Sequence, residues 1–132
     1  MFRKNTYITK GINEELNPVI IMKLWEKVQS ANNRELDYLQ VFNLRNIGEP
    51  NRPSVEVKWK QEVPEHHETF IIEGVNTDVD RVWIICTAEG TDDEYSTMLL
   101  PEEYWCFIQV INPEEATTKI YQLIKRMIGI FP

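Results

Sequence analysis

Glycine is scarce in this sequence, and the scarcity excludes the phosphate-binding loops of common nucleotide enzymes. Only 5 of the 132 residues are glycine, and none of them are clustered. Nucleotide-binding loops and dinucleotide fingerprints need several glycines at close spacing. A serine elbow flanked by glycines, as hydrolases use, is also missing. The sequence therefore offers no catalytic residues to assign, and it favours a non-enzymatic protein.

Cysteine is equally rare. Cys86 and Cys106 are the only two, and both lie among apolar residues without the paired spacing of a zinc site. Free cysteine behaves as a small hydrophobic residue and is usually buried. We therefore expect two reduced, buried thiols, no bound metal and no cofactor.

Long hydrophobic runs are absent as well. Residues 1–16 contain basic residues but no apolar run of signal-peptide length. Elsewhere, charges interrupt every apolar stretch well short of the roughly 20 residues that span a bilayer. These absences predict a cytoplasmic protein without a membrane partner.

What is present is ordinary for a globular chain, with 42% hydrophobic and 27% charged residues. A chain of this length predicts a single domain, residues 1–132. Two helices are expected. The first begins at Asn17 as N-cap with Pro18 in its first turn, and the second begins in the same way at Asn112 and Pro113. The apolar stripe of the first helix is predicted to be Ile21, Leu24, Trp25 and Val28.

Between the helices, apolar runs of period two or of continuous β-branched and aromatic residues predict strands. A further short strand, ending at Gly11, precedes the first helix. Short loops between consecutive strands favour antiparallel pairing, and residues 76–80 predict a hairpin connection. We expect an α+β fold in which an N-terminal and a C-terminal helix pack on a curved antiparallel sheet of about five or six strands. The expected strands after the first helix are residues 37–44, 54–60, 68–75, 80–88 and 94–100.

The run at 37–44 carries polar residues, and these raise the question of a site. Both faces of this strand are largely apolar, so we expect a central strand. Gln40 and Asn43 are predicted to lie near its margins, and Asp37 at its start. No second group nearby indicates that these residues form a site. The pattern after Pro101 opens a helix, and residues 104–111 are compatible with either helix or strand.

Four sequence blocks come in the same order, with similar gaps, as those of a bacterial family. They are "RKNTYITKGI", "ELDYLQVFNL", "QEVPEH" and "YSTMLLPEEY", within residues 3–104. The chain resembles the family catalogued as domain of unknown function 960. The resemblance implies a small cytoplasmic protein of low-GC Gram-positive bacteria, their phages or mobile elements, with no assigned activity and no catalytic residues. His66 and His67 stand where the family usually has one aromatic residue, so they depart from its pattern.

Charge is distributed unevenly along the chain. Residues 62–115 contain fourteen acidic residues and one basic residue, Arg81, for a net charge of −13, while the segments before and after each carry +3. An acidic surface repels nucleic acid and attracts basic proteins. We therefore predict binding to a basic protein surface. Nucleic-acid-handling proteins have such surfaces, and this chain would inhibit or modulate one of them. The predicted contact residues are Asp92, Asp93, Glu94, Glu102 and Glu103.

Other interpretations of the same sequence remain open. Acidic turns also simply keep a small protein soluble. A small ligand such as a nucleotide could bind aromatic residues, with Trp59, Trp83 and Tyr104 as candidates. A metal-dependent hydrolase would need the carboxylates of residues 92–94 together with His66 or His67. Adjacent histidines on a strand point to opposite faces, so we expect instead a solvated loop pair after Pro64.

Overall fold

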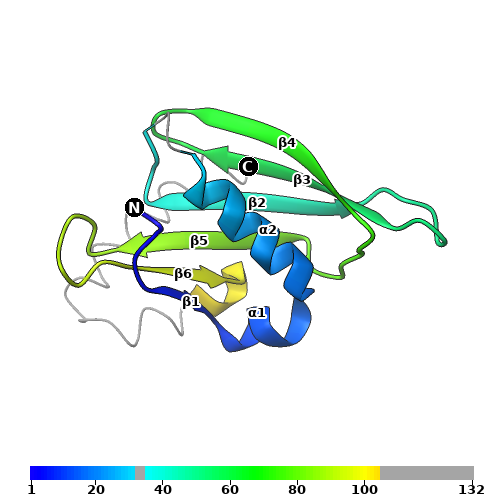
Figure 1. Cartoon of the computed structure of the whole chain (residues 1–132), viewed down its shortest axis with the longest axis horizontal. Coiled ribbons are helices and arrows are strands. Elements are labelled where there is room, and N and C mark those ends of the chain that lie inside the picture. Colours follow the sequence, from blue (N-terminus) through cyan, green and yellow to red (C-terminus); the bar gives the residue numbers. More distant parts are fainter. Residues whose placement is uncertain (32–34, 105–132) are drawn as a thin grey trace. The chain divides into compact units, whose positions relative to one another are not determined.

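A computed structural model gives the structure of the chain, and residues 1–31 and 35–104 are described. One sheet of six strands runs through them in the order β1-β6-β5-β2-β3-β4 (Figure 1). The predicted α+β class and strand number are therefore confirmed. The chain divides into two units after Pro101, and the sheet lies in the unit Met1–Pro101. The predicted C-terminal helix and Cys106 lie outside the described residues, and the single domain remains a prediction.

The described elements follow one another from strand to helices to strands. They are β1 Thr6–Ile8, α1 Lys10–Glu15, α2 Pro18–Gln29, β2 Leu39–Asn46, β3 Ser54–Gln61, β4 His66–Glu73, β5 Arg81–Thr87, β6 Tyr95–Leu99 and a 3-10 turn at Pro101–Glu103.

The first strand differs from the prediction in length and in direction. β1 ends at Ile8 because Thr9 caps a short helix, its hydroxyl accepting a hydrogen bond from the backbone N–H of Ile12. Gly11, expected to end the strand, lies inside α1. β1 also pairs with β6 in parallel, so the purely antiparallel sheet was wrong at this edge. Parallel pairing is possible because a long crossover, residues 9–94, connects the two strands.

Helix α2 begins as the sequence predicts. The side chain of Asn17 accepts a hydrogen bond from Val19 N at 2.8 Å, and Pro18 occupies the first turn. The fully buried residues are Ile20, Leu24 and Val28, spaced four apart. Ile21 and Trp25 are only half-buried, so the face toward the sheet is rotated from the predicted stripe.

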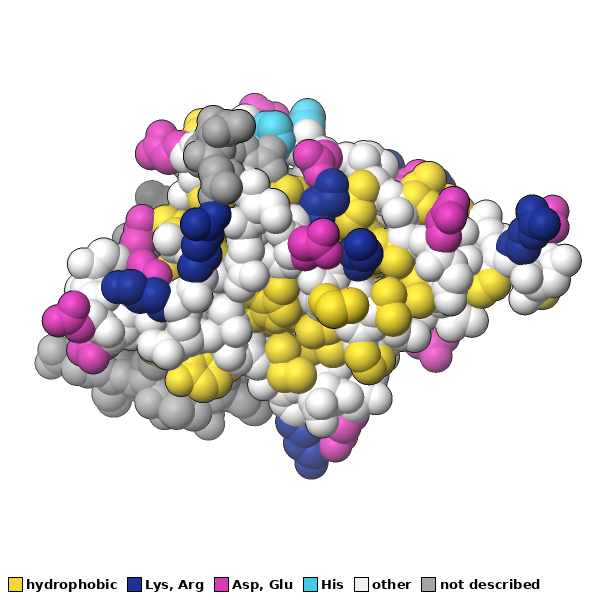
Figure 2. All heavy atoms as spheres, viewed as in Figure 1, with side chains coloured by type: hydrophobic (Ala, Val, Ile, Leu, Met, Phe, Trp, Pro, Cys, Tyr) yellow, Lys and Arg dark blue, Asp and Glu magenta, His cyan; other side chains and the backbone are white. Residues whose placement is uncertain are grey.

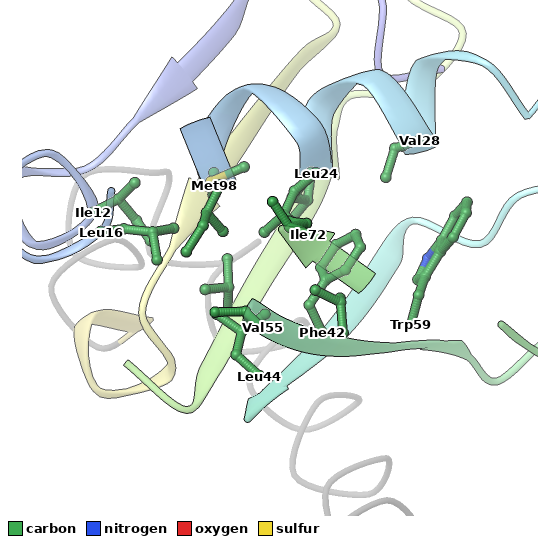
Figure 3. Packing of buried hydrophobic residues seen from close by; sticks show 14 of the residues in the cluster. Ile12, Leu16, Leu24, Val28, Phe42, Leu44, Val55, Trp59, Ile72 and Met98 are labelled. Atoms are coloured by element: carbon green, nitrogen blue, oxygen red, sulfur yellow. The ribbon is translucent and has the colours of Figure 1, made fainter. Parts of the chain in front are cut away.

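Apolar side chains from α2 and from one face of the sheet form a common core (Figure 3). Phe42 of β2 stacks on Trp59 of β3, with ring centroids 5.8 Å apart. The alternation predicted for β3 is confirmed, because Val55, Val57 and Trp59 are buried. Other members of this core are Phe2, Ile12, Leu16, Ile20, Leu24, Val28, Leu44, Ile72, Val82, Ile84, Cys86 and Met98.

Strand β2 is central, as predicted. It pairs antiparallel with β3 on one side and with β5 on the other. Side chains on both of its faces are buried, from Leu39 through Phe42. Successive side chains on a strand alternate between its two faces. Because both faces are buried here, a polar side chain in this stretch lies inside the protein.

The hairpin predicted between β4 and β5 is wrong. β4 pairs only with β3 among the described strands, whereas β5 pairs with β2 and β6. Residues 74–80 carry the chain back past β3 and β2, and Asn46 of β2 holds them through hydrogen bonds of 2.7 and 2.9 Å to the backbone of Thr77. The physical reason is burial. β5 is apolar on both faces, so a central position buries both of them.

Candidate functional site

The strand directions bring three acidic loops to one end of the sheet. β3 and β5 end there, and β2, β4 and β6 begin there, as their registers require. We call the loops 35–38, 62–65 and 88–94 the acidic end. Figure 2 shows acidic side chains along this end, at the left. Its carboxylates are Glu35, Asp37, Glu62, Glu65, Glu89, Asp92, Asp93 and Glu94.

Few basic side chains of the described residues lie beside these carboxylates. β1 begins at the same end because it runs parallel to β6, which places Arg3 and Lys4 of residues 1–5 nearby. The Arg3 guanidinium donates two hydrogen bonds to the backbone oxygen of Gln29, from Nη2 at 2.8 Å and from Nε at 3.1 Å. Within the described residues, the carboxylates of the three loops therefore outnumber the basic side chains beside them, which are Arg3, Lys4 and Lys60 of β3.

The turn between β5 and β6 presents Asp92 and Asp93 at its tip, as predicted. Both side chains are exposed. The backbone beneath them is held by Thr91, whose hydroxyl donates to Ala88 O at 2.7 Å and accepts from Asp93 N at 3.2 Å. Gly90 adopts a φ of 79°, which glycine tolerates without strain. The two carboxylates therefore stand on an ordered turn.

Glu94 does not belong to that exposed tip, although the sequence grouped it there. Its side chain is 5% exposed, and its Oε1 accepts a hydrogen bond from Gly90 N at 3.2 Å. Asn5 donates to its backbone oxygen at 3.4 Å. The carboxylate of Glu94 thus stabilises the turn from its buried side, and Glu94 is not available as a contact residue.

The turn between β3 and β4 is anchored by buried side-chain amides. Gln61 donates from Nε2 to Pro64 O at 2.8 Å and to Glu35 O at 2.9 Å, joining two of the acidic loops. Asp37 accepts from Val63 N at 3.2 Å. These contacts fix the loops that carry the exposed carboxylates of Glu62 and Glu65.

Gln40 is the second residue of β2, near the margin of the strand as predicted, but its side chain lies at the centre of this network. The side chain is fully buried. Its Oε1 accepts from Trp59 Nε1 at 2.6 Å, and its Nε2 donates to Asp37 O at 2.7 Å and to Gln61 Oε1 at 3.1 Å. A buried amide is stable only when its donors and acceptors are bonded, and these bonds supply that.

Gln61 was not among the residues predicted from the sequence, although the sequence contains a signal for it. β3 alternates apolar-inward with polar-outward, and Gln61 follows Trp59 in the inward phase. A polar residue at an inward position must find buried partners or cost stability. The phase of the strand alone could therefore have pointed to a buried network.

The other predicted contact residues lie after β6. Glu102 is exposed and Glu103 is half-buried, both in the 3-10 turn. The aromatic residues of the ligand hypothesis are buried: Trp59 is 2%, Trp83 1% and Tyr104 7% exposed. Because their rings are packed, they do not offer an open stacking surface, and the ligand hypothesis gains no support.

His66 and His67 are the first residues of β4, so the loop predicted for them is wrong. As strand neighbours, they point to opposite faces of the sheet. Two strands lie between β4 and β5, which puts the histidines at least about 14 Å from the 88–94 turn at the usual strand spacing. Metal ligands must lie within about 2.6 Å of one ion. Within residues 1–31 and 35–104 no group of three metal-ligating side chains is assembled.

Cys86 is buried and not in a disulfide, as predicted. Burial in the core raises the pKa of its thiol above the ordinary value, and the nearby Ser96 hydroxyl opposes this shift more weakly. A raised pKa keeps the thiol protonated, so Cys86 is a packing residue.

A hollow of about 390 Å³ opens at the acidic end. Arg3, Glu35 and Glu89 line it, together with Val28 and Gln29 near the end of α2. Its lining contains none of the three aromatic residues proposed for ligand binding.

Helices of the described chain are all too short or too polar to cross a membrane.

Comparison with known proteins found a solved structure with a similar fold. A crystal structure of a protein of unknown function from Enterococcus faecalis is similar, with a TM-score of 0.61 and 19% sequence identity. The similarity covers 77% of this chain and 93% of that chain. At this identity the likeness shows the fold alone. A search of curated proteins found no match.

The family resemblance drawn from the four sequence blocks is confirmed. Residues 5–103 match the family described as Staphylococcal protein of unknown function. The match includes every strand of the sheet and the loops of the acidic end. The chain therefore belongs to the family of domain of unknown function 960.

Proposed function

We propose that this protein acts without catalysis, by binding a basic surface of another protein through its acidic end. One observation carries the proposal: strands β2 to β6 bring three separate acidic loops to the same end of the sheet. The β5–β6 and β3–β4 turns are about 14 Å apart at the usual strand spacing, so one partner surface can contact both.

Order in these loops supports the proposal. The hydrogen bonds of Thr91 and Glu94 hold one turn, and those of Gln61 hold the other. Carboxylates on a fixed backbone lose less conformational entropy on binding than carboxylates on a mobile loop. Like charges held close together also repel one another, and a basic partner relieves that repulsion.

The chemistry of the partner follows from the charge. Phosphates are repelled at this end, so we propose no direct contact with nucleic acid there. A protein surface that normally holds nucleic acid is basic and would be attracted. We propose that this chain modulates such a nucleic-acid-handling protein in the cytoplasm of a Gram-positive bacterium, as a product of the bacterium, a phage or a mobile element.

The test compares charge-neutralised variants at two ends of the sheet. Asp92→Asn with Asp93→Asn removes two charges from the acidic end and leaves Glu94 in place. Asp78→Asn with Asp80→Asn removes two exposed charges from the opposite end and serves as the matched control. Each protein is immobilised and exposed to lysate of a Gram-positive host at two salt concentrations, with mass spectrometry of the bound proteins.

We expect the wild type and the control to retain a basic protein at low salt and to lose it at high salt, because salt screens exposed charges beyond about 10 Å at 0.1 M. The acidic-end variant should bind about tenfold more weakly. Its melting temperature should change little, since surface substitutions typically cost under about 0.5 kcal/mol. Equal binding by both variants would contradict the proposal for this turn. Glu102→Gln with Glu103→Gln tests the remaining predicted contacts in the same assay.

A further inference from the structure

Among the described strands, β4 forms one edge of the sheet, and it lacks most of the features that protect an edge strand. It is eight residues long, whereas β1 at the other edge has three. Proteins usually protect edge strands with proline, lysine, inward-pointing charges, a bulge or short length. The inward-pointing charge of β4, Glu68, forms an ion pair with Lys27 of α2. β4 contains no proline, lysine or arginine, and its register with β3 runs without a bulge from Ser54 opposite Glu73 to Gln61 opposite His66.

The backbone groups that point outward can be identified from one hydrogen bond. Gly74 N donates to Pro53 O at 2.8 Å, so Pro53 and Gly74 form a hydrogen-bonded pair. Such pairs alternate along an antiparallel ladder, so the even-numbered residues of β4 bond to β3. The odd-numbered residues direct their N–H and C=O groups away from β3. Within the described chain, no backbone hydrogen bond reaches these outward groups, which belong to His67, Thr69, Ile71 and Glu73.

Side chains of the same four residues lie on the sheet face opposite α2. The neighbouring residues Glu68 and Phe70 face α2, since Lys27 Nζ lies 3.1 Å from the Glu68 carboxylate and 4.7 Å from the Phe70 ring centroid. Successive side chains on a strand alternate between faces. The face opposite α2 therefore presents Ile71, which is 55% exposed, at the open edge.

We propose that this edge pairs with β4 of a second copy of the chain, antiparallel about a twofold axis at Phe70. In this register His67 lies opposite Glu73 of the partner, and Thr69 opposite Ile71. Every outward N–H and C=O is then used, giving roughly eight hydrogen bonds. His67 and Glu73 are complementary, since an imidazole can donate to a carboxylate. A register shifted by two residues uses fewer of these groups and sets His67 against Ile71.

The first test removes an outward backbone donor without touching the β3 ladder. Thr69→Pro deletes an N–H that points away from β3, a position where an edge strand tolerates proline. Thr69→Ala keeps the N–H and is the matched control. The molar mass of each full-length chain is measured over a range of concentrations by sedimentation equilibrium. We expect a dimer for the wild type and for Thr69→Ala, and dimerisation weakened by about tenfold or more for Thr69→Pro.

A charge exchange tests the register and does not depend on proline. His67→Glu places carboxylates opposite one another and should weaken the dimer, and adding Glu73→Lys should restore it. Both positions are exposed, so both variants should fold. A wild-type chain that stays monomeric, or a Thr69→Pro chain that is folded and dimerises as strongly as Thr69→Ala, overturns the proposal. Failure of the exchange to restore the dimer overturns the register.

Discussion

Replacing Gln40 with leucine tests how much the buried hydrogen-bond network stabilises the fold. Leucine fills a similar volume but removes the three hydrogen bonds to Trp59, Asp37 and Gln61. Each buried hydrogen bond contributes about 1 kcal/mol net, and the gain from the apolar side chain offsets about one of them. We expect the free energy of unfolding to fall by about 2 kcal/mol.

Urea unfolding followed by circular dichroism measures this loss. With a slope of about 2 kcal/mol per molar urea, the midpoint should shift downward by about 1 M. Asn43→Leu is the control, because Asn43 is a half-buried polar residue of the same strand. It should change stability by under about 0.5 kcal/mol. Equal stability of Gln40→Leu and Asn43→Leu, with unchanged slope, would refute the reasoning.

A double-mutant cycle tests the pairing inside the network. Trp59→Phe removes the indole donor that Gln40 accepts at 2.6 Å. Combined with Gln40→Leu, it should cost less than the sum of the two single changes, because the same hydrogen bond is lost only once. Strict additivity would indicate that the two side chains do not depend on one another.

Two further predictions concern packing. The Cys86 thiol should react with iodoacetamide about tenfold or more slowly in the native protein than in urea, because it is buried and its raised pKa keeps the thiolate scarce. Peptide mass spectrometry over a time course measures the two reaction rates. Equal rates would contradict the burial. Gly48→Ala should lower stability by about 1–3 kcal/mol in urea unfolding, because a Cβ there would meet Arg52 O and Ser54 N of the backbone, so a neutral substitution would contradict the close approach.

Local signals in the sequence were sufficient for most individual elements. The cap at Asn17 and the proline after it marked the start of α2, and the alternation of Val55, Val57 and Trp59 marked β3. These features depend on neighbours within a few residues. The order of the strands depends on distant partners, so sequence adjacency suggested a β4–β5 hairpin where the sheet places β5 beside β2.

The candidate site was predictable in composition but not in detail. The excess of carboxylates after residue 62 was visible, and Asp92 and Asp93 are exposed as expected. Glu94 has the same chemistry as its neighbours, but it is buried and its carboxylate accepts a hydrogen bond from Gly90 N within the turn. Glu35 joins the acidic end through the direction of β2, which no local pattern encodes.

The parallel pairing of β1 with β6 has a consequence for synthesis of the chain. Thr6 aligns with Ser96, so β1 can pair only after about ninety further residues have been synthesised. Non-local pairings of this kind slow folding because a large loop must close first. β2, β3 and β4 can pair as soon as they have been synthesised, whereas β1 stays unpaired until β6 has been synthesised. A nascent chain that stops before Tyr95 would leave β5 as an unprotected edge, exposed to association with other chains.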